Sequence, residues 1–215
     1  QHAEWVSAHC MVQRSTQSAP QLHMLVFPAS AIKQHNNWQV LGLRGTGSVD
    51  ISVDDLFVPS DMAWHVEAQS PQRGGPLYRL GIPAFVAYEH AAFATGVARR
   101  ALNALTELAI TKKRGYGPGA ISLADRGVIQ RLIGHSDLRL RSARALSMNL
   151  NQQAMDTIYA GEPIDTRLAL ELRGSAVYCT EVACEIINAA FRACGAAAIF
   201  EGSVIQRCLR DINVA

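Results

Sequence analysis

The segment Trp38–Pro59, WQVLGLRGTGSVDISVDDLFVP, constrains the fold of this chain more than any other stretch. Its apolar start leads into a glycine-rich turn, RGTGS, and then into Val49–Asp54, where apolar and polar residues alternate strictly. Such alternation is typical of an antiparallel strand with one solvated face. One extra residue at Asp54–Asp55 indicates a bulge, and Pro59 ends the pairing.

Further strands are predicted on both sides of this turn. Glu4–Arg14 and Gln21–Phe27 mix β-branched, aromatic and other apolar residues, and the polar run Ser15–Ser18 separates them. Strand, turn, strand is the simplest interpretation. His35–Leu43 is predicted to form a third strand.

The composition changes between Ser60 and Gly81, where Pro, Gly, Gln and Ser gather around SPQRGGP. This stretch marks a domain boundary. We therefore expect a β-domain in residues 1–62, a linker in residues 63–81 and a helical domain in residues 82–215.

Four helices are expected in the second part, from apolar residues at helical spacing and from capping residues at their ends. The expected spans are Ala84–Lys113, Ser122 or Asp125 to Tyr159, Asp165–Ala193 and Ser203–Ala215. The fold class is thus α+β, a partial antiparallel β-barrel or sandwich followed by an up-and-down four-helix bundle. The far half of the third helix is apolar on nearly every face, which predicts burial in the bundle or at a subunit contact. A homo-oligomer, dimer or tetramer, is therefore expected.

Charge and composition exclude several classes of function. The formal net charge is +2, so no overall field attracts nucleic acid or anionic lipid. No apolar run is long enough for a membrane span, and no signal peptide is visible near Gln1. The 5 cysteines show no zinc-type spacing and fit reduced thiols of a cytoplasmic protein. A chain that starts without Met inside strand-like sequence is expected to be a piece of a longer protein.

Chemical motifs taken alone leave the function open. The RGTGS turn offers backbone amides, two hydroxyls and the Arg44 guanidinium, which suit a phosphate or a carboxylate; a plain turn between strands is the alternative. No helix follows it, so it is not a dinucleotide fingerprint. His90 either faces an active-site cavity or is a satisfied core histidine. The seven histidines show no metal spacing.

The two ends of the chain resemble one superfamily. Trp38–Pro59 is similar to the W-x-x-x-G-x-R-G-T-G-S … D-x-F-V-P segment of acyl-CoA dehydrogenase-like flavoproteins, and His2–Trp5 to their H-A-x-W. Gly195–Ile199 with Gln206, Arg207, Arg210 and Asp211 resembles their G-S-A-I … Q-R … R-D-I-H-V-A ending. The resemblance covers nearly the whole chain and fits the branch of two-component flavin-dependent monooxygenases best.

The resemblance implies a fold and a cofactor. In that family an N-terminal helical domain, a middle β-domain and a C-terminal four-helix bundle hold FAD or FMN between sheet and bundle. This chain would supply the second half of the β-domain and most of the bundle, so by itself it is expected to lack a complete flavin site and to be inactive.

Three functions follow as alternatives. The favoured one is the oxygenase component of a two-component monooxygenase, which takes reduced flavin from a reductase and hydroxylates an aromatic or similar small substrate through a flavin C4a-hydroperoxide. The second is an acyl-CoA dehydrogenase, which desaturates an acyl-CoA thioester. The third is a non-catalytic remnant that mediates assembly. The monooxygenase histidine would lie beyond Ala215, and Asn213 replaces the usual His of the motif.

Site residues follow from the same resemblance. Glu201 adjoins the position of the dehydrogenase base, with a helix-start carboxylate as the structural alternative. Arg114 and Gln130 are similar to flavin contacts that dehydrogenases make in a neighbouring subunit, although the gap between them is longer here and contains SLAD; a simple helix–helix loop is the alternative. The remaining expected flavin contacts are Thr46, Ser48, Gly195 and Ala196. No metal site is expected.

Overall fold

The computed structural model describes residues 3–16, 18–66, 74–115 and 117–215. The chain has an α+β fold, in which small antiparallel sheets precede four packed helices, as the sequence predicts. Its described residues form two compact units. One takes residues from 1–40 and 44–73, and the other takes Leu41–Leu43 together with residues from 74–215. Each unit is described separately below.

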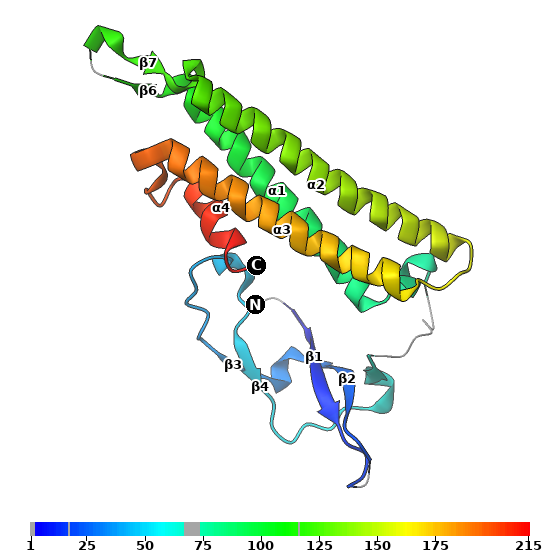
Figure 1. Cartoon of the computed structure of the whole chain (residues 1–215). Coiled ribbons are helices and arrows are strands. Elements are labelled where there is room, and N and C mark those ends of the chain that lie inside the picture. Colours follow the sequence, from blue (N-terminus) through cyan, green and yellow to red (C-terminus); the bar gives the residue numbers. More distant parts are fainter. Residues whose placement is uncertain (1–2, 17, 67–73, 116) are drawn as a thin grey trace. The chain divides into compact units, whose positions relative to one another are not determined.

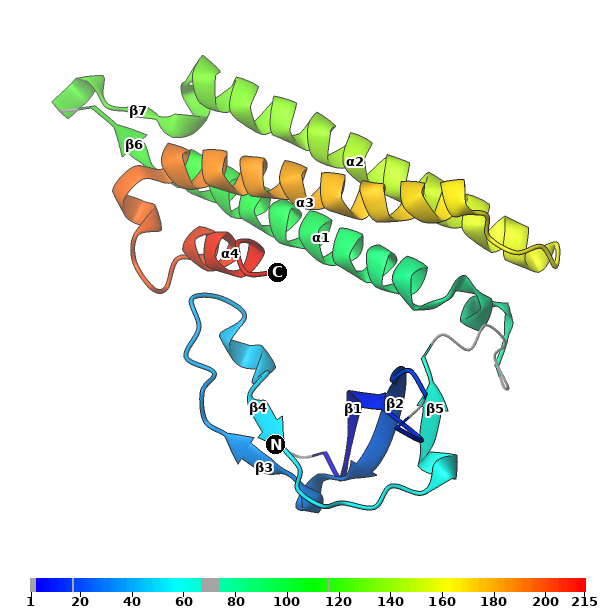
Figure 2. The ribbon, with the colours of Figure 1, turned by 60° about the horizontal axis from the view of Figure 1, so that its bottom comes forward.

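The first unit contains two small antiparallel sheets (Figures 1 and 2). β1 (Trp5–Val12) pairs with β2 (Gln21–Pro28), and β5 (Ala63–His65) pairs with the other edge of β2. β3 (Lys33–His35) pairs with β4 (Asp50–Ser52) in the second sheet. Among the described residues of this unit, Phe27 and His23 are the buried ones.

The first two predicted strands are present, but the prediction for the third is wrong over most of its length. Only His35 of the expected strand His35–Leu43 lies in a strand, β3. The alternating segment Val49–Asp54 keeps strand structure over Asp50–Ser52, and the turn beyond it has Asp55 at a positive φ of 47°. In the stretch 63–81, where a linker is expected, β5 and a short 3₁₀ helix (Pro76–Leu80) form.

Three long helices run antiparallel in succession in the second unit, and a short fourth helix lies against the first and third (Figures 1 and 2). They are α1 (Ile82–Thr111), α2 (Gly127–Tyr159), α3 (Thr166–Cys194) and α4 (Val204–Ile212). Between α1 and α2 the chain forms the hairpin β6 (Lys113–Arg114) and β7 (Ile121–Ser122) at one end of the bundle. None of the described helices is long and apolar enough to cross a membrane.

Small side chains line the contact between α1 and α3. The buried alanines of α1 recur at alternating spacings of three and four residues, the pattern of helices that pack side by side. They are Ala84, Ala87, Ala91, Ala94, Ala98 and Ala101. The buried face of α3 includes Ala176, Cys179, Ala183 and Ala190. Because these side chains are short, the two helix axes approach closely along the core.

Local interactions set the helix ends and cross-link the bundle. The Asp165 carboxylate accepts a 2.7 Å hydrogen bond from the Leu168 amide and caps α3. The Ser203 hydroxyl caps α4. Ser122 instead caps a 3₁₀ turn, so α2 begins only at Gly127. Arg99 of α1 pairs with Asp137 of α2, and Arg139 of α2 pairs with Glu185 of α3.

Candidate functional site

The RGTGS turn places its two hydroxyls together in the first unit. Arg44–Thr46 form a 3₁₀ turn and Gly47 has a positive φ of 59°. The Thr46 and Ser48 hydroxyl oxygens lie 3.0 Å apart, and both residues are exposed. The Arg44 Nε atom donates to the Val40 carbonyl at 2.9 Å, and Arg44 is exposed like the two hydroxyl residues.

A second group of predicted residues meets at the C-terminal end of α3. Gly195 caps this helix with φ 56°, and a Cβ atom there would lie only 2.8 Å from the Arg114 Nη2 atom. The Lys112 ammonium donates to the Cys194 carbonyl at 2.6 Å. Two cations from the hairpin region therefore lie at the negative end of the α3 dipole. The Arg114 guanidinium has no hydrogen-bond or ion-pair partner among the described residues, so its donors can take an anionic group such as a phosphate.

Of the other three predicted residues, Ala196 is exposed in the 3₁₀ turn Gly195–Ala198 that follows α3, and the structure does not join Gln130 or Glu201 to these groups. Gln130 of α2 is exposed and donates to the Ala124 carbonyl at 2.8 Å, a contact that closes the start of its own helix. Glu201 is exposed in the turn before α4, and no described residue forms a hydrogen bond or ion pair with it. Glu201 is therefore a solvated carboxyl group in this structure and does not line the cleft described below.

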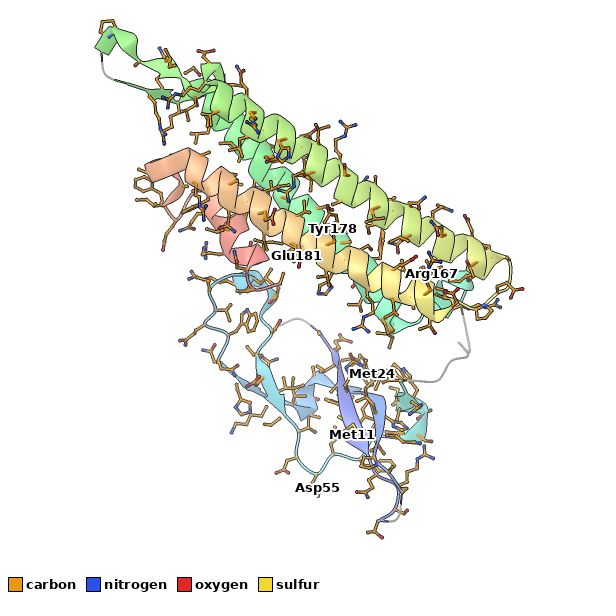
Figure 3. All side chains as sticks on the ribbon, viewed as in Figure 1. Met11, Met24, Asp55, Arg167, Tyr178 and Glu181 are labelled. Carbon is orange, nitrogen blue, oxygen red and sulfur yellow. The ribbon has the colours of Figure 1, made fainter. Side chains whose placement is uncertain are left out.

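A cleft of about 460 Å³ lies in the helical unit, between α1, α3 and the last residue of the chain. Its lining is mostly apolar, with Ala87 on α1 and Ala176 and Val177 on α3, and its size suits a small organic ligand. Polar groups are placed around this lining by His90, Arg173, Thr180 and Glu181. Figure 3 shows Glu181 on α3, where this helix passes the C-terminal end of α4.

The cleft is suited to binding and not to nucleophilic attack by the protein. Burial raises the pKa of the Cys184 thiol, and the Glu181 carboxylate raises it further, so this lining thiol stays protonated near neutral pH. His90 has its Nδ1 atom 3.2 Å from the Val86 carbonyl oxygen. If Nδ1 carries the proton, Nε2 is left as an acceptor. No group of described residues is arranged to bind a metal ion.

His90 thus lines a cavity, one of the two possibilities left open by the sequence. Sequence reasoning missed Arg173 and Glu181, which line the same cleft. The available signal was their position. Both residues are ionisable and both lie in α3, a helix whose far half is nearly all apolar. Both line the groove beside α1.

The C-terminal motif residues form a connected set of hydrogen bonds. Gln206 donates to the Ile199 carbonyl at 3.5 Å and accepts from the Arg210 guanidinium at 3.1 Å. Arg210 also donates to the Leu41 carbonyl at 3.0 Å, and Asp211 accepts from the Leu43 amide at 2.8 Å. The two stretches that carry the family resemblance therefore meet, because Leu41–Leu43 packs within the helical unit.

Comparison with known proteins places this arrangement in a family. Residues 88–215 match the family model described as acyl-CoA dehydrogenase, C-terminal domain. The indole-3-acetate monooxygenase of Pseudomonas putida is 30% identical over 191 residues, which cover 89% of this chain and 48% of that protein. The flavin-dependent monooxygenase oxygenase subunit HsaA of Rhodococcus jostii is 27% identical, over 99% of this chain and 57% of its own length.

Solved structures agree on the fold. The 3-HSA hydroxylase of Rhodococcus sp. RHA1 superposes with a TM-score of 0.88 at 24% identity, over 99% of this chain and 56% of that one. XiaF from Streptomyces, solved in complex with FADH2 and glycerol, gives 0.85 at 22% identity, over 99% and 55% of the two chains. The chain spans about half the length of the curated relatives it matches. It belongs to the acyl-CoA dehydrogenase C-terminal domain family and is homologous to the oxygenase subunits of flavin-dependent monooxygenases.

Proposed function

We propose that this chain is part of the oxygenase component of a two-component flavin-dependent monooxygenase that hydroxylates an aromatic or similar small substrate. The observation that carries the proposal is the match to such oxygenases along nearly the whole chain, 99% of it for the oxygenase subunit HsaA. The proteins matched in this way are named for indole-3-acetate and for a flavin-dependent oxygenase reaction. A reductase would supply the reduced flavin.

The residues present fit a flavin in two places. At the end of α3, the unpaired Arg114 guanidinium lies beside Gly195, where a larger side chain would meet it, and this arrangement suits a phosphate group of FMN or FAD. In the first unit, the Thr46 and Ser48 hydroxyls and the amides around Gly47 are able to bond polar atoms of a flavin. Reduced flavin, when bound, would supply the activation of oxygen.

The cleft between α1 and α3 supports the substrate assignment. Its mostly apolar lining suits an aromatic ring, while Arg173 offers donors and His90 Nε2 offers an acceptor to polar substituents of that ring. The chain's own contribution to the reaction is thus to bind and orient the substrate, with the ring against Ala87 and Val177 and its polar substituent at the rim.

The two ends of the bundle have different roles in this proposal, because the substrate cleft and the Arg114–Gly195 group lie far apart. His90 and the end of α1 are 21 residues apart in one helix, which corresponds to about 30 Å at a rise of 1.5 Å per residue. An isoalloxazine ring is far shorter. The substrate cleft and the Arg114–Gly195 group are therefore too far apart to contact the same isoalloxazine ring, and the resemblance to dehydrogenases implies that Arg114 contacts the flavin of a neighbouring copy of the chain.

An acyl-CoA dehydrogenase is the second candidate, favoured by the position of Glu201 directly before the helix that carries Arg210 and Asp211. Against it, Glu201 is exposed, and no hydrogen bond or ion pair from another described residue holds it in place as a base. If this candidate is correct, Glu201→Gln abolishes acyl-CoA-dependent flavin reduction.

The deciding experiment uses the protein in the full length that its gene encodes. Supplied with reduced FMN or FAD, oxygen and indolic or phenolic substrates, it is expected to form hydroxylated product, detected by mass spectrometry with one atom from ¹⁸O₂. The 215-residue chain alone is expected to bind flavin weakly and to form no product. Flavin reduction by acyl-CoA substrates, without hydroxylation, would refute the monooxygenase proposal.

A further inference from the structure

The segment directly before the RGTGS turn is bonded to side chains of α4. The Leu43 amide donates to Asp211 Oδ1 at 2.8 Å, and the Leu41 carbonyl accepts from Arg210 Nη1 at 3.0 Å. Two adjacent side chains of one helix thus satisfy backbone groups on both sides of Gly42. Both bonds join a charged side chain to the backbone, the stronger class of hydrogen bond in proteins.

Position 42 requires glycine because there is no space for a side chain, and not because of its backbone conformation. It is buried, and a Cβ atom added to it would lie 2.2 Å from the Arg210 carbonyl oxygen and 2.5 Å from the carbonyl carbon. Real Cβ atoms do not approach backbone atoms so closely. The backbone of the segment therefore lies directly against the backbone of α4, and any larger residue at position 42 has to push the two apart.

Leu43 has a backbone conformation that leucine rarely adopts. Its φ is 51°, in the left-handed region that favours glycine. The amide that Asp211 accepts from is the amide of this same residue. Strained residues persist when surrounding contacts hold them, and they gather at functional sites. Arg44, the first residue of the RGTGS turn, follows immediately.

The α4 side of this contact is itself held in place. The Arg210 guanidinium donates a second bond to Gln206, at 3.1 Å, one turn earlier in the helix. Ile205, Cys208 and Ile212 bury the opposite face of α4. Arg210 and Asp211 are thus presented to the 41–43 segment from a packed helix.

We propose that Asp211 is a positioning residue for the RGTGS turn, assisted by Arg210 and by the absence of a side chain at Gly42. By holding Leu43 in the left-handed conformation, it fixes the backbone from which the RGTGS turn starts, and so it keeps the Thr46 and Ser48 hydroxyls in the arrangement that binds flavin. This inference rests on the proposed function, because it assigns those hydroxyls to flavin binding.

The test measures reduced-flavin affinity in the full-length protein, with photoreduced FMN and FAD as probes. Asp211→Ala is expected to raise the dissociation constant about tenfold, the fold-change that corresponds to one lost charge-assisted hydrogen bond. Asp211→Asn keeps an Oδ1 acceptor and is expected to recover part of the affinity. Gly42→Ala breaks the same contact and is expected to match Asp211→Ala, with no further loss in the double variant.

A double-mutant cycle separates positioning from general destabilisation. In a Thr46→Val/Ser48→Ala background, Asp211→Ala is expected to add less than about a twofold change, because the groups it positions are already gone. A full additional tenfold loss in that background would overturn the proposal, since Asp211 would then act by another route. Asp156→Ala on α2 and Gly134→Ala, which has open space around it, are the matched controls.

Hydrogen exchange keeps the two proposals distinguishable. Asp211→Ala is expected to lower protection of the Leu43 amide while that of the α1 core amides is retained. Unchanged protection at Leu43 would refute the anchor even in a protein that hydroxylates its substrate. If the wild-type protein binds no flavin, the proposed function fails and the positioning role fails with it, although the exchange result still decides whether Asp211 holds Leu43.

Discussion

Each of the 5 cysteine thiols has a reactivity set by its surroundings in the bundle or the sheet. Cys179, Cys194 and Cys208 are buried, and this burial raises their thiol pKa values. Near Cys194 and Cys208, basic side chains oppose the rise without cancelling it. A raised pKa means that less thiolate is present at neutral pH, and thiolate is the reactive form. All five thiols are free.

Alkylation of the native protein tests this difference in reactivity among the five thiols. Iodoacetamide at pH 8 is expected to modify Cys10, which is half-buried on β1, before Cys184 and well before the three buried thiols, as followed by peptide mass spectrometry. In concentrated urea all five should react at comparable rates, which provides the control for intrinsic reactivity. Early modification of Cys179, whose thiol contacts the Ala143 carbonyl of α2, would show that the contact between α2 and α3 opens readily.

The packing of α1 on α3 depends on short side chains, and this dependence gives a prediction at the level of the element. Ala98 is fully buried in the stripe of alanines that faces the core. Ala98→Leu adds three carbon atoms where the helices are closest, so it is expected to lower the free energy of unfolding by about 1–3 kcal/mol. Guanidinium denaturation monitored by circular dichroism measures the change.

Ala92→Leu is the matched control for this substitution. Ala92 lies on the same helix but is exposed, so the same added volume is expected to change the unfolding free energy by less than about 0.5 kcal/mol. Equal destabilisation by both variants would mean that leucine affects α1 by another route than overpacking.

Helices were more predictable from sequence than the short strands, for a physical reason. α1 and α3 carry their signals locally, in apolar spacing and in residues such as Asp165 and Gly195 that cap them. The predicted strand over His35–Leu43 failed because the Leu43 amide bonds to Asp211, 168 residues away, and not to a neighbouring strand. Apolar periodicity does not encode a partner so distant in sequence. The family resemblance identified both stretches, but it did not indicate that they are in contact.

The residues of the candidate site differ in the same way: some could be predicted from the sequence, and others are found only in the structure. Sequence motifs named Arg114 and Gly195 separately, and the structure brings them together because the β6–β7 hairpin lies at the end of α3. The cleft residues Arg173 and Glu181 belong to no motif. They are found only once α1 and α3 are packed side by side, since a groove is a property of two helices and not of one.

For the whole molecule, the exposed side chains of α3 bear on assembly. The far half of this helix is predicted from sequence to be buried on several sides, yet within one chain Tyr178 is 44% exposed. Leu170, about two turns before Tyr178, is 61% exposed. Apolar residues that recur on one helix face outside the core are typical of a surface that another molecule covers. We propose that a second copy of the protein covers this face.

Light scattering on the full-length protein tests this assembly. The wild-type protein is expected to be a dimer or tetramer at micromolar concentration, and Leu170→Lys/Tyr178→Lys is expected to shift it toward smaller species, because a buried lysine without a partner opposes association. Gln152→Lys, a new charge at an exposed position of α2, should leave the molecular mass unchanged. A wild-type monomer would refute the assembly. It would also remove the neighbouring copy of the chain whose flavin Arg114 is proposed to contact.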